Sequence, residues 1–250
     1  MVAREGMPIH GWINLDKPCG ISSAKAVAVV KRVFNAKKAG HGGTLDPLAS
    51  GVLPIALGEA TKTVSYTMSK KKTYEFRLAW GAETTTDDTE GEITLRSEVH
   101  PTDELIDQAL ERFQGIIEQV PPYYSAVKID GARAYHLARQ GNIGHQLPSI
   151  KSREVRIDRF WRLESNSTGA SFFVECGKGA YIRSLARDLG RALGSAAHVI
   201  DLRRLSVGQF HADHAISLDF LEKLTHSAAA FEHLHPVMRA LDDIPALPIS

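Results

Sequence analysis

Several features that mark common protein classes are missing from this sequence of 250 residues. Its two cysteines, Cys19 and Cys176, are too few for a disulfide framework or a cysteine metal site, and they favour a reducing, cytoplasmic location. No apolar run approaches the roughly 18 residues that a membrane-spanning helix needs, and residues 1–10 lack the apolar core of a signal peptide. A P-loop, a GxGxxG fingerprint, a GxSxG elbow and an internal repeat are also missing.

An excess of charge of either sign is missing as well. The chain has 30 Lys and Arg against 29 Asp and Glu, a net charge of +1, so any nucleic-acid site must be a local patch. One region is locally basic, and it is either a phosphate-facing surface or a solvated helix face. Its cations are Lys25, Lys31, Arg32, Lys37, Lys38, Lys70, Lys71 and Lys72.

The most informative stretch is residues 40–51, which read GHGGTLDPLASG. Its four glycines and one proline exclude an ordinary helix or central strand, and Pro47 directs Asp46 toward extended or turn backbone. The apolar run 52–57 that follows predicts a buried strand, and a polar loop fixed to such a strand is a common place for chemistry. A surface loop with a capping aspartate is the simpler alternative for an isolated Asp-Pro pair.

Asp46 is the strongest candidate for a reacting group. A free aspartate is ionised at neutral pH, so it can attack an electrophilic carbon or act as a base. Glycosidic-bond chemistry fits one carboxylate, although the usual hydrolase needs two. The pair Asp87 and Asp88 favours a turn cap over paired acids, and the helical spacing of His211 and His214 lacks the other ligands of a metal site.

The order of expected elements predicts an α+β fold with a mixed sheet, because strands and helices alternate irregularly and hairpins are present. Ser22 or Ser23 is expected to cap the helix 24–34, and Thr102 and Ser217 are expected to cap helices that end near residues 113 and 224. Residues 123–148 are expected to form an insertion, with a strand at 123–129 and a helix at 132–140, that could close over a ligand. The other expected strands are 11–15, 73–80, 155–163 and 171–176, and the other expected helices are 24–34 and 180–193.

Four stretches, in order, resemble motifs of the TruB family of tRNA pseudouridine synthases. They are residues 11–18 with 20–23, then 41–53, 72–75 and 179–190. Residues 120–137 also resemble the RNA-clasping insertion of that family, and the whole resemblance spans about residues 9–224. It implies an α+β fold whose central sheet is mixed, largely antiparallel and flanked by helices.

The resemblance also implies an activity. The family isomerises a uridine in the T-loop of tRNA: the base is cut from its ribose at N1, turned and rejoined through C5, without a cofactor. The implied partner is therefore the T-arm of tRNA, with no metal, DNA or membrane, for a protein expected to be monomeric. Two other classes stay open, namely an RNA-binding protein that keeps the fold without catalysis, and an N-glycosidase or phosphate-handling enzyme that uses the same loop.

By this resemblance Asp46 is the catalytic carboxylate, acting at the sugar C1′ or at the base. Tyr74 would stack on the uracil, and Arg183 would pair with Asp46. The other implied substrate-binding residues are His41, which would fill the space of the flipped base, and Tyr181 and Leu202, which would line the base pocket.

The implied domain organisation is a catalytic domain over residues 9–235 and a tail over 236–250, without the complete PUA domain that many members carry. Two departures concern RNA contacts. Gly177 and Ala180 stand where the family often has Ser and Thr, and residues 205–209 are less basic than the family pattern.

Overall fold

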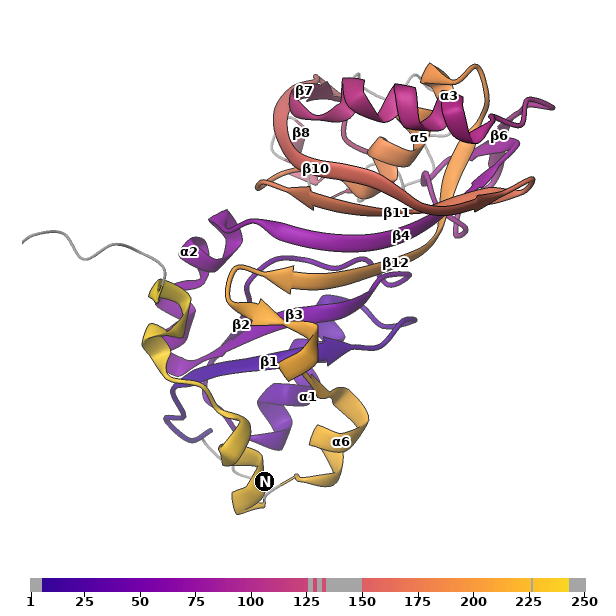
Figure 1. Cartoon of the computed structure of the whole chain (residues 1–250). Coiled ribbons are helices and arrows are strands. Elements are labelled where there is room, and N and C mark those ends of the chain that lie inside the picture. The colour runs from indigo at the N-terminus through magenta and orange to yellow at the C-terminus, as the bar shows by residue number, and fades with distance from the viewer. Residues whose placement is uncertain (1–5, 126–127, 130–131, 134–149, 226, 243–250) are drawn as a thin grey trace, which may run out of the picture. The chain divides into compact units, whose positions relative to one another are not determined.

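The computed structural model describes residues 6–125, 128–129, 132–133, 150–225 and 227–242 (Figure 1). These residues belong to two compact units: unit 1 comprises residues 1–74 and 203–250, and unit 2 comprises residues 75–202. Strands β4 (Lys72–Trp80) and β12 (Ala197–Val207) contribute residues to both units. Among the described residues, no helix is long and apolar enough to cross a bilayer.

Unit 1 is built on strands in the hydrogen-bonded order β14-β1-β3-β12. β1 and β3 are antiparallel, whereas β14 pairs with β1, and β12 with β3, in parallel. The strands are β1 (Gly11–Lys17), β2 (Ala39–His41), β3 (Ser50–Leu57), β13 (Phe210–His211) and β14 (Ile216–Ser217). The helices are α1 (Ser23–Val33), α2 (Val64–Ser69), α6 (Leu218–Lys223) and the 3-10 turns η1 (Gly58–Lys62), η3 (Ala212–His214), η4 (Ala228–His233) and η5 (Val237–Leu241).

The core of unit 1 joins the first strand to the last third of the chain. Trp12 is completely buried, its ring centroid lies 5.5 Å from that of Phe210, and its indole N–H donates to the carbonyl of Val237. Burying one such aromatic ring contributes on the order of 3 kcal/mol to stability. Helix α1 starts where the Ser22 hydroxyl accepts a hydrogen bond from the Lys25 N–H, which satisfies one of the free donors of the first turn.

Strand β3 changes partner in the middle of one edge. One edge pairs with β1 over residues 51–57, while the other pairs with β12 at Ser50 and Gly51 and with β2 at residues 55–57. Pro54, which has no N–H to donate, lies between these two partners, which explains a proline in a buried strand. In this gap the Pro54 carbonyl accepts from the N–H of Gly42, so the glycine loop takes the place of a neighbouring strand.

Unit 2 contains strands in the order β4-β11-β10-β7, and the β10 pairs are antiparallel. Its strands are β5 (Ala82–Thr84), β6 (Ile93–Arg96), β7 (Gly115–Gln119), β8 (Lys128–Ile129), β9 (Ala132–Arg133), β10 (Arg153–Asn166) and β11 (Gly169–Cys176). Its helices are α3 (Asp103–Leu110), the 3-10 turn η2 (Glu111–Phe113) and α5 (Ile182–Ala192).

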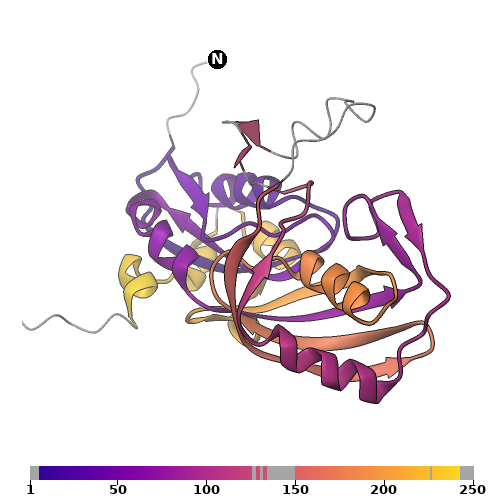
Figure 2. The same ribbon diagram turned by 90° about the horizontal axis from the view of Figure 1, so that it is seen from above.

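Aromatic side chains form the core of unit 2. Phe76 on β4 stacks on Phe172 of β11 at 5.2 Å and on Phe160 of β10 at 6.0 Å. Helix α3 contacts both β10 and α5, and Figure 2 shows both helices running along the β10–β11 hairpin. Eight of the eleven residues of α5 are buried, including Arg183 and Arg187, so this helix is interior on most of its surface.

The predicted α+β fold with a mixed, largely antiparallel sheet is confirmed. Ser22, Thr102 and Ser217 cap helices as expected. The sequence missed strand β7, and the predicted helix 132–140 is wrong at its start, because Ala132 and Arg133 form β9 in a hairpin with β8. The rest of that helix and most of the predicted insertion 123–148 lie outside the described residues, although Tyr123–Ser125 form no strand.

Gly51 has a conformation that another residue would adopt only with strain. Its φ is +101°, and a Cβ there would lie 2.2 Å from the carbonyl oxygen of Arg204. We expect Gly51→Ala to lower the free energy of unfolding by more than about 1 kcal/mol in denaturant titrations. Gly40→Ala is the control: Gly40 has an ordinary φ with open space around it, so a change within about 0.5 kcal/mol is expected. Equal stabilities of the two variants would contradict this reading of the loop.

Candidate active site

A buried arginine holds the loop that carries Asp46. Arg204 on β12 is 1% exposed, and its guanidinium donates to the carbonyls of Gly43 at 3.0 Å, Thr44 at 3.2 Å and Val52 at 2.7 Å. These acceptors lie before and after Asp46 in the chain, so one side chain ties both arms of the loop. The parallel register that pairs Arg204 with Gly51 places the arginine at this position.

A second set of contacts fixes the tip of the loop. The buried hydroxyl of Ser23, the first residue of α1, bonds to both the N–H and the carbonyl of Leu45 at 2.8 Å. The Pro47 carbonyl accepts from the N–H of Gly20, and the Asp46 carbonyl accepts from the N–H of Ala49. Asp46 is therefore half-buried on a backbone whose polar groups are bonded on both sides.

The charges around the loop are predominantly positive. Burial lowers the pKa of Lys17 from 10.5 to about 8, against the opposing effects of the charges of Cys19 and Asp46. The Lys17 amine is completely buried and donates to the carbonyls of Pro18 and Ile21. Burial, reinforced by the positive charge of Arg204, holds the pKa of His41 below its usual 6.5, so this imidazole is neutral at neutral pH.

Lys72, the first residue of the motif at 72–75, is buried although its neighbours in the sequence are basic. Lys72 is 7% exposed, and its amine donates to the carbonyls of Met68 and Lys70, each at 2.5 Å. Neither alternative for the basic region, a phosphate-facing surface or a solvated face, therefore describes Lys72, whose amine bonds to backbone carbonyls at the end of α2. Tyr74, two residues further along β4, is 8% exposed.

In unit 2, two arginines of α5 are anchored to an acidic loop. Arg187 pairs with Asp87 at 2.8 Å, and Arg183 lies 3.4 Å from Asp88 while donating to the carbonyl of Thr86. Burial raises the pKa of Asp87 to about 6, although the charges of Arg187 and Arg183 act in the opposite direction. The turn cap that the sequence favoured is confirmed for Asp88, whose carboxylate accepts from the N–H of Glu90 and the hydroxyl of Thr86. The sequence did not predict that both aspartates also form buried ion pairs with these arginines.

The predicted site residues fall into both units. His41, Asp46 and Tyr74 belong to unit 1, and the first two share the same loop. The others belong to unit 2: Tyr181 and Arg183 at the start of α5, and the buried Leu202 on β12. The predicted pairing of Arg183 with Asp46 joins residues of different units and stays a prediction.

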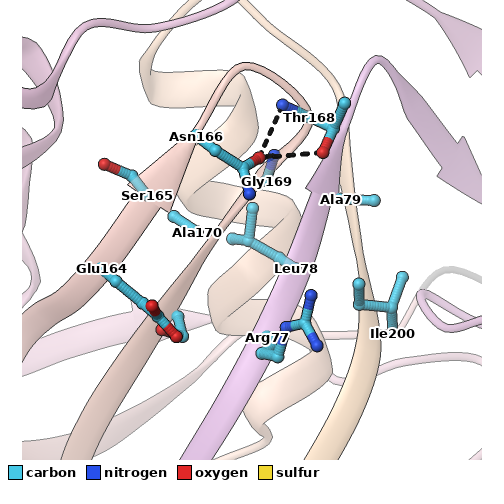
Figure 3. A pocket seen from close by; sticks show the side chains of 11 residues that line it. Arg77, Leu78, Ala79, Glu164, Ser165, Asn166, Thr168, Gly169, Ala170 and Ile200 are labelled. Carbon is cyan, nitrogen blue, oxygen red and sulfur yellow. Dashed lines mark hydrogen bonds between the residues drawn. The ribbon is translucent and has the colours of Figure 1, made fainter.

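A separate pocket of about 300 Å³ lies in unit 2 beside the tip of the β10–β11 hairpin (Figure 3). None of the six predicted site residues lines it. The side-chain oxygen of Asn166 accepts from both the N–H and the hydroxyl of Thr168, as the dashed lines in Figure 3 show. These polar groups of the pocket lining therefore stabilise the turn of the β10–β11 hairpin. Across the described residues, no group of three or more His, Cys, Asp or Glu could hold a metal.

Comparison with known proteins identifies the class. The family model for the N-terminal domain of TruB pseudouridylate synthases matches residues 31–182, and that for the C-terminal domain of tRNA pseudouridylate synthase B matches residues 183–244. The class is therefore that of the pseudouridylate synthases, which are isomerases. The chain belongs to the TruB family.

Curated relatives agree with this assignment. The chain is 53% identical over 255 residues to tRNA pseudouridine synthase B of Bradyrhizobium diazoefficiens, covering 100% of this chain and 73% of the relative. It is 51% identical over 248 residues to the protein of the same name from Rhodospirillum rubrum, covering 99% of this chain and 79% of the relative.

Chains in solved structures of H/ACA complexes share the fold. A chain of an archaeal box H/ACA sRNP complex superposes with a TM-score of 0.68 at 28% identity, and a chain of an H/ACA RNP bound to a substrate RNA with 0.67 at 28%. Each match covers 92% of this chain, which spans 61% and 60% of those chains.

Sequence reasoning missed the residues that hold the loop. Arg204 and Ser23 carry no signal of their own, because a charged residue in a strand is usually read as an exposed position and a serine at a helix start as a cap. Only the pairing of β12 with β3 shows that Arg204 points under the loop.

Removing the Arg204 guanidinium leaves the carbonyls of Gly43, Thr44 and Val52 without this donor. We expect Arg204→Met to lower the free energy of unfolding by about 3 kcal/mol, because each unsatisfied group costs about 1–3 kcal/mol. The His41 pKa, followed by NMR titration, is expected to rise, because the repelling charge is gone. Arg32→Met, which removes an exposed pair with Glu222, should change stability by less than about 1 kcal/mol and leave His41 unaffected. An unchanged His41 pKa in Arg204→Met would contradict this geometry.

The raised pKa of Asp87 predicts how the free energy of unfolding depends on pH. Between about pH 4 and pH 6 the folded protein keeps a proton on Asp87 that the unfolded chain has lost, so this group makes stability fall as pH rises through that window. Asp87→Asn should remove this slope, which is worth on the order of 3 kcal/mol for two units. Asp107→Asn is the control: the hydrogen bond from Arg162 lowers the pKa of Asp107, so its effect lies below pH 4. A slope between pH 4 and 6 that survives in Asp87→Asn would refute the assignment.

Proposed function

We propose that this protein converts one uridine in the T-loop of tRNA to pseudouridine, with Asp46 as the catalytic carboxylate. The observation that supports this best is the loop of residues 42–50, whose carbonyls and N–H groups are held by Arg204, Ser23 and Gly20 while its single carboxylate stays half-buried. Bacterial relatives at about half identity carry the name tRNA pseudouridine synthase B, and we therefore place the reaction in the cytoplasm, where tRNA resides.

The proposed reaction is an isomerisation, so atoms balance without a co-reactant. The bond between N1 and C1′ breaks, a bond between C5 and C1′ forms, the C5 hydrogen leaves as a proton, and N1 gains a proton. Asp46 acts either by attack at C1′ or at the base. A fixed carboxylate suits both routes, because a loop held in place before binding costs no reorganisation during the reaction.

Reaching C1′ and C5 requires the uridine to leave the base stack. In our proposal Tyr74 stacks on the extruded uracil, while Tyr181 and Leu202 line its pocket and Arg183 orients Asp46. A neutral His41 suits the space left by the base, because an uncharged imidazole can stack between bases with a small desolvation cost. The exposed cations Lys31, Lys37, Lys38 and Lys71 are suited to contact phosphates.

The experiment that tests the function uses unmodified tRNA and maps pseudouridine to a nucleotide. We expect one new pseudouridine, in the T-loop, and no release of free uracil. Release of uracil would favour an N-glycosidase, and tRNA binding without any product would favour an RNA-binding protein that only keeps the fold.

Replacing the Asp46 carboxylate by an amide keeps its shape and removes its charge. We expect Asp46→Asn to lower single-turnover tritium release from C5-labelled tRNA by at least about 10³-fold, with a tRNA dissociation constant within about threefold of wild type. Asp213→Asn, which changes an aspartate in η3, is the control and should keep the wild-type rate. Near-normal turnover by Asp46→Asn would exclude Asp46 as the reacting group.

A further inference from the structure

Tyr181 is held by a side chain that binds its backbone on both sides. The amide N–H of Gln119 donates to the Tyr181 carbonyl at 3.1 Å, and the Tyr181 N–H donates to the Gln119 side-chain oxygen at 2.8 Å. Gln119 is 1% exposed, so its side-chain amide is shielded from water. Tyr181 has extended backbone angles just before the first turn of α5, and its own side chain does not cap the helix. Its carbonyl also accepts from the N–H of Leu185 within the helix, whereas its N–H has its partner in Gln119.

The ring of Tyr181 is held by a second residue. The guanidinium carbon of Arg153 lies 4.9 Å from the centre of the ring, within the range of a cation–π contact. The same guanidinium donates a hydrogen bond to the carbonyl of Gly179, two residues before Tyr181. Arg153 therefore fixes the ring relative to the turn that leads into α5, and it occupies one face of the ring.

Sheet register explains why these two residues act together. Arg153 on β10 and Gln119 on β7 are directly paired across the antiparallel strands. The chain leaves β7 through Val120, whose carbonyl accepts from the Ser184 hydroxyl and from Arg187 of α5. The edge of the sheet and the first two turns of α5 thus form one hydrogen-bonded block that contains Tyr181.

We propose that Gln119 and Arg153 are positioning residues for the reaction, which set the ring of Tyr181 so that only its free face and edge can meet the target uracil. This inference rests on the proposed function, because it assigns the uracil to Tyr181. Neither residue touches the reacting atoms. The alternative role for an arginine in this position is direct binding of an RNA phosphate, and it makes a different prediction.

Arg153→Met separates the two roles, because methionine keeps most of the side-chain length and removes the guanidinium. We expect its single-turnover rate at saturating tRNA to fall about tenfold through loss of ring orientation. Its tRNA affinity and the slope of log affinity against log salt should match wild type. Arg153→Lys retains a cation for the ring and should recover part of the rate. Arg159→Met, an exposed position on the same strand, is the matched control and should behave as wild type.

Two results would overturn the proposal. One is a saturating rate for Arg153→Met within about twofold of wild type. The other is a salt slope for Arg153→Met that is shallower than that of wild type by about one unit, which marks a lost phosphate contact. A wild-type protein that makes no pseudouridine would instead refute the proposed function. If Arg153→Met does not fold, NMR of the wild type and of Tyr181→Leu tests the contact instead. The ring-current shifts of the Arg153 side-chain protons in the wild type are expected to disappear in Tyr181→Leu. Shifts that persist in Tyr181→Leu would refute the contact.

Discussion

The hydrogen bonds from Arg204 to the glycine loop are the interaction on which the candidate site depends. A buried guanidinium is costly unless its donors are satisfied, and here three backbone carbonyls satisfy them. The carbonyls of Gly43 and Thr44 lie in a loop that belongs to no strand, and the carbonyl of Val52 lies on β3 just beyond its pairs with β12 at Ser50 and Gly51. The guanidinium donors of Arg204 and these carbonyl acceptors therefore satisfy each other.

This arrangement also explains the composition of the loop. Gly51 lies so close to the Arg204 backbone that no side chain fits, and Gly43 adopts a φ of +135° as its carbonyl meets the guanidinium. Burial is the main cause of the lowered pKa values of His41 and Lys17, and the positive charge of Arg204 lowers both further. One buried cation thus holds the loop and disfavours protonation of its neighbours.

The second anchored element is α5, whose arginines bind an acidic loop while its first residues bind β7 and β10. Buried ion pairs are not a dependable source of stability, because desolvation offsets much of their attraction. Here the ion pairs fix the position of helix α5. Asp87 is less stable as a carboxylate than in water, yet its pairing with Arg187 fixes the helix that carries Tyr181 and Arg183.

The sequence predicted what local rules decide. Serine and threonine caps placed the starts of α1, α3 and α6, and glycine with proline located the loop of Asp46. Local rules failed where contacts in the folded chain decide the outcome. The burial of Arg204 depends on the parallel pairing of β12 with β3. Lys72 belongs to a basic triplet in the sequence, but in the structure its amine bonds to backbone carbonyls at the end of α2. The ion pairs of Asp87 and Asp88 were missed for the same reason, since their partners are about a hundred residues away.

The central claim is that the Asp46 loop is held in place before any RNA binds, and amide hydrogen exchange in the free protein tests it most directly. The N–H groups of Gly42, Leu45 and Ala49 are hydrogen-bonded to Pro54, Ser23 and Asp46. We expect their exchange to be slowed at least about a hundredfold relative to an unstructured peptide, because opening the loop must break its bonds to Arg204 and Ser23. Exchange at unstructured rates in the free protein, with protection only after tRNA is added, would contradict this account.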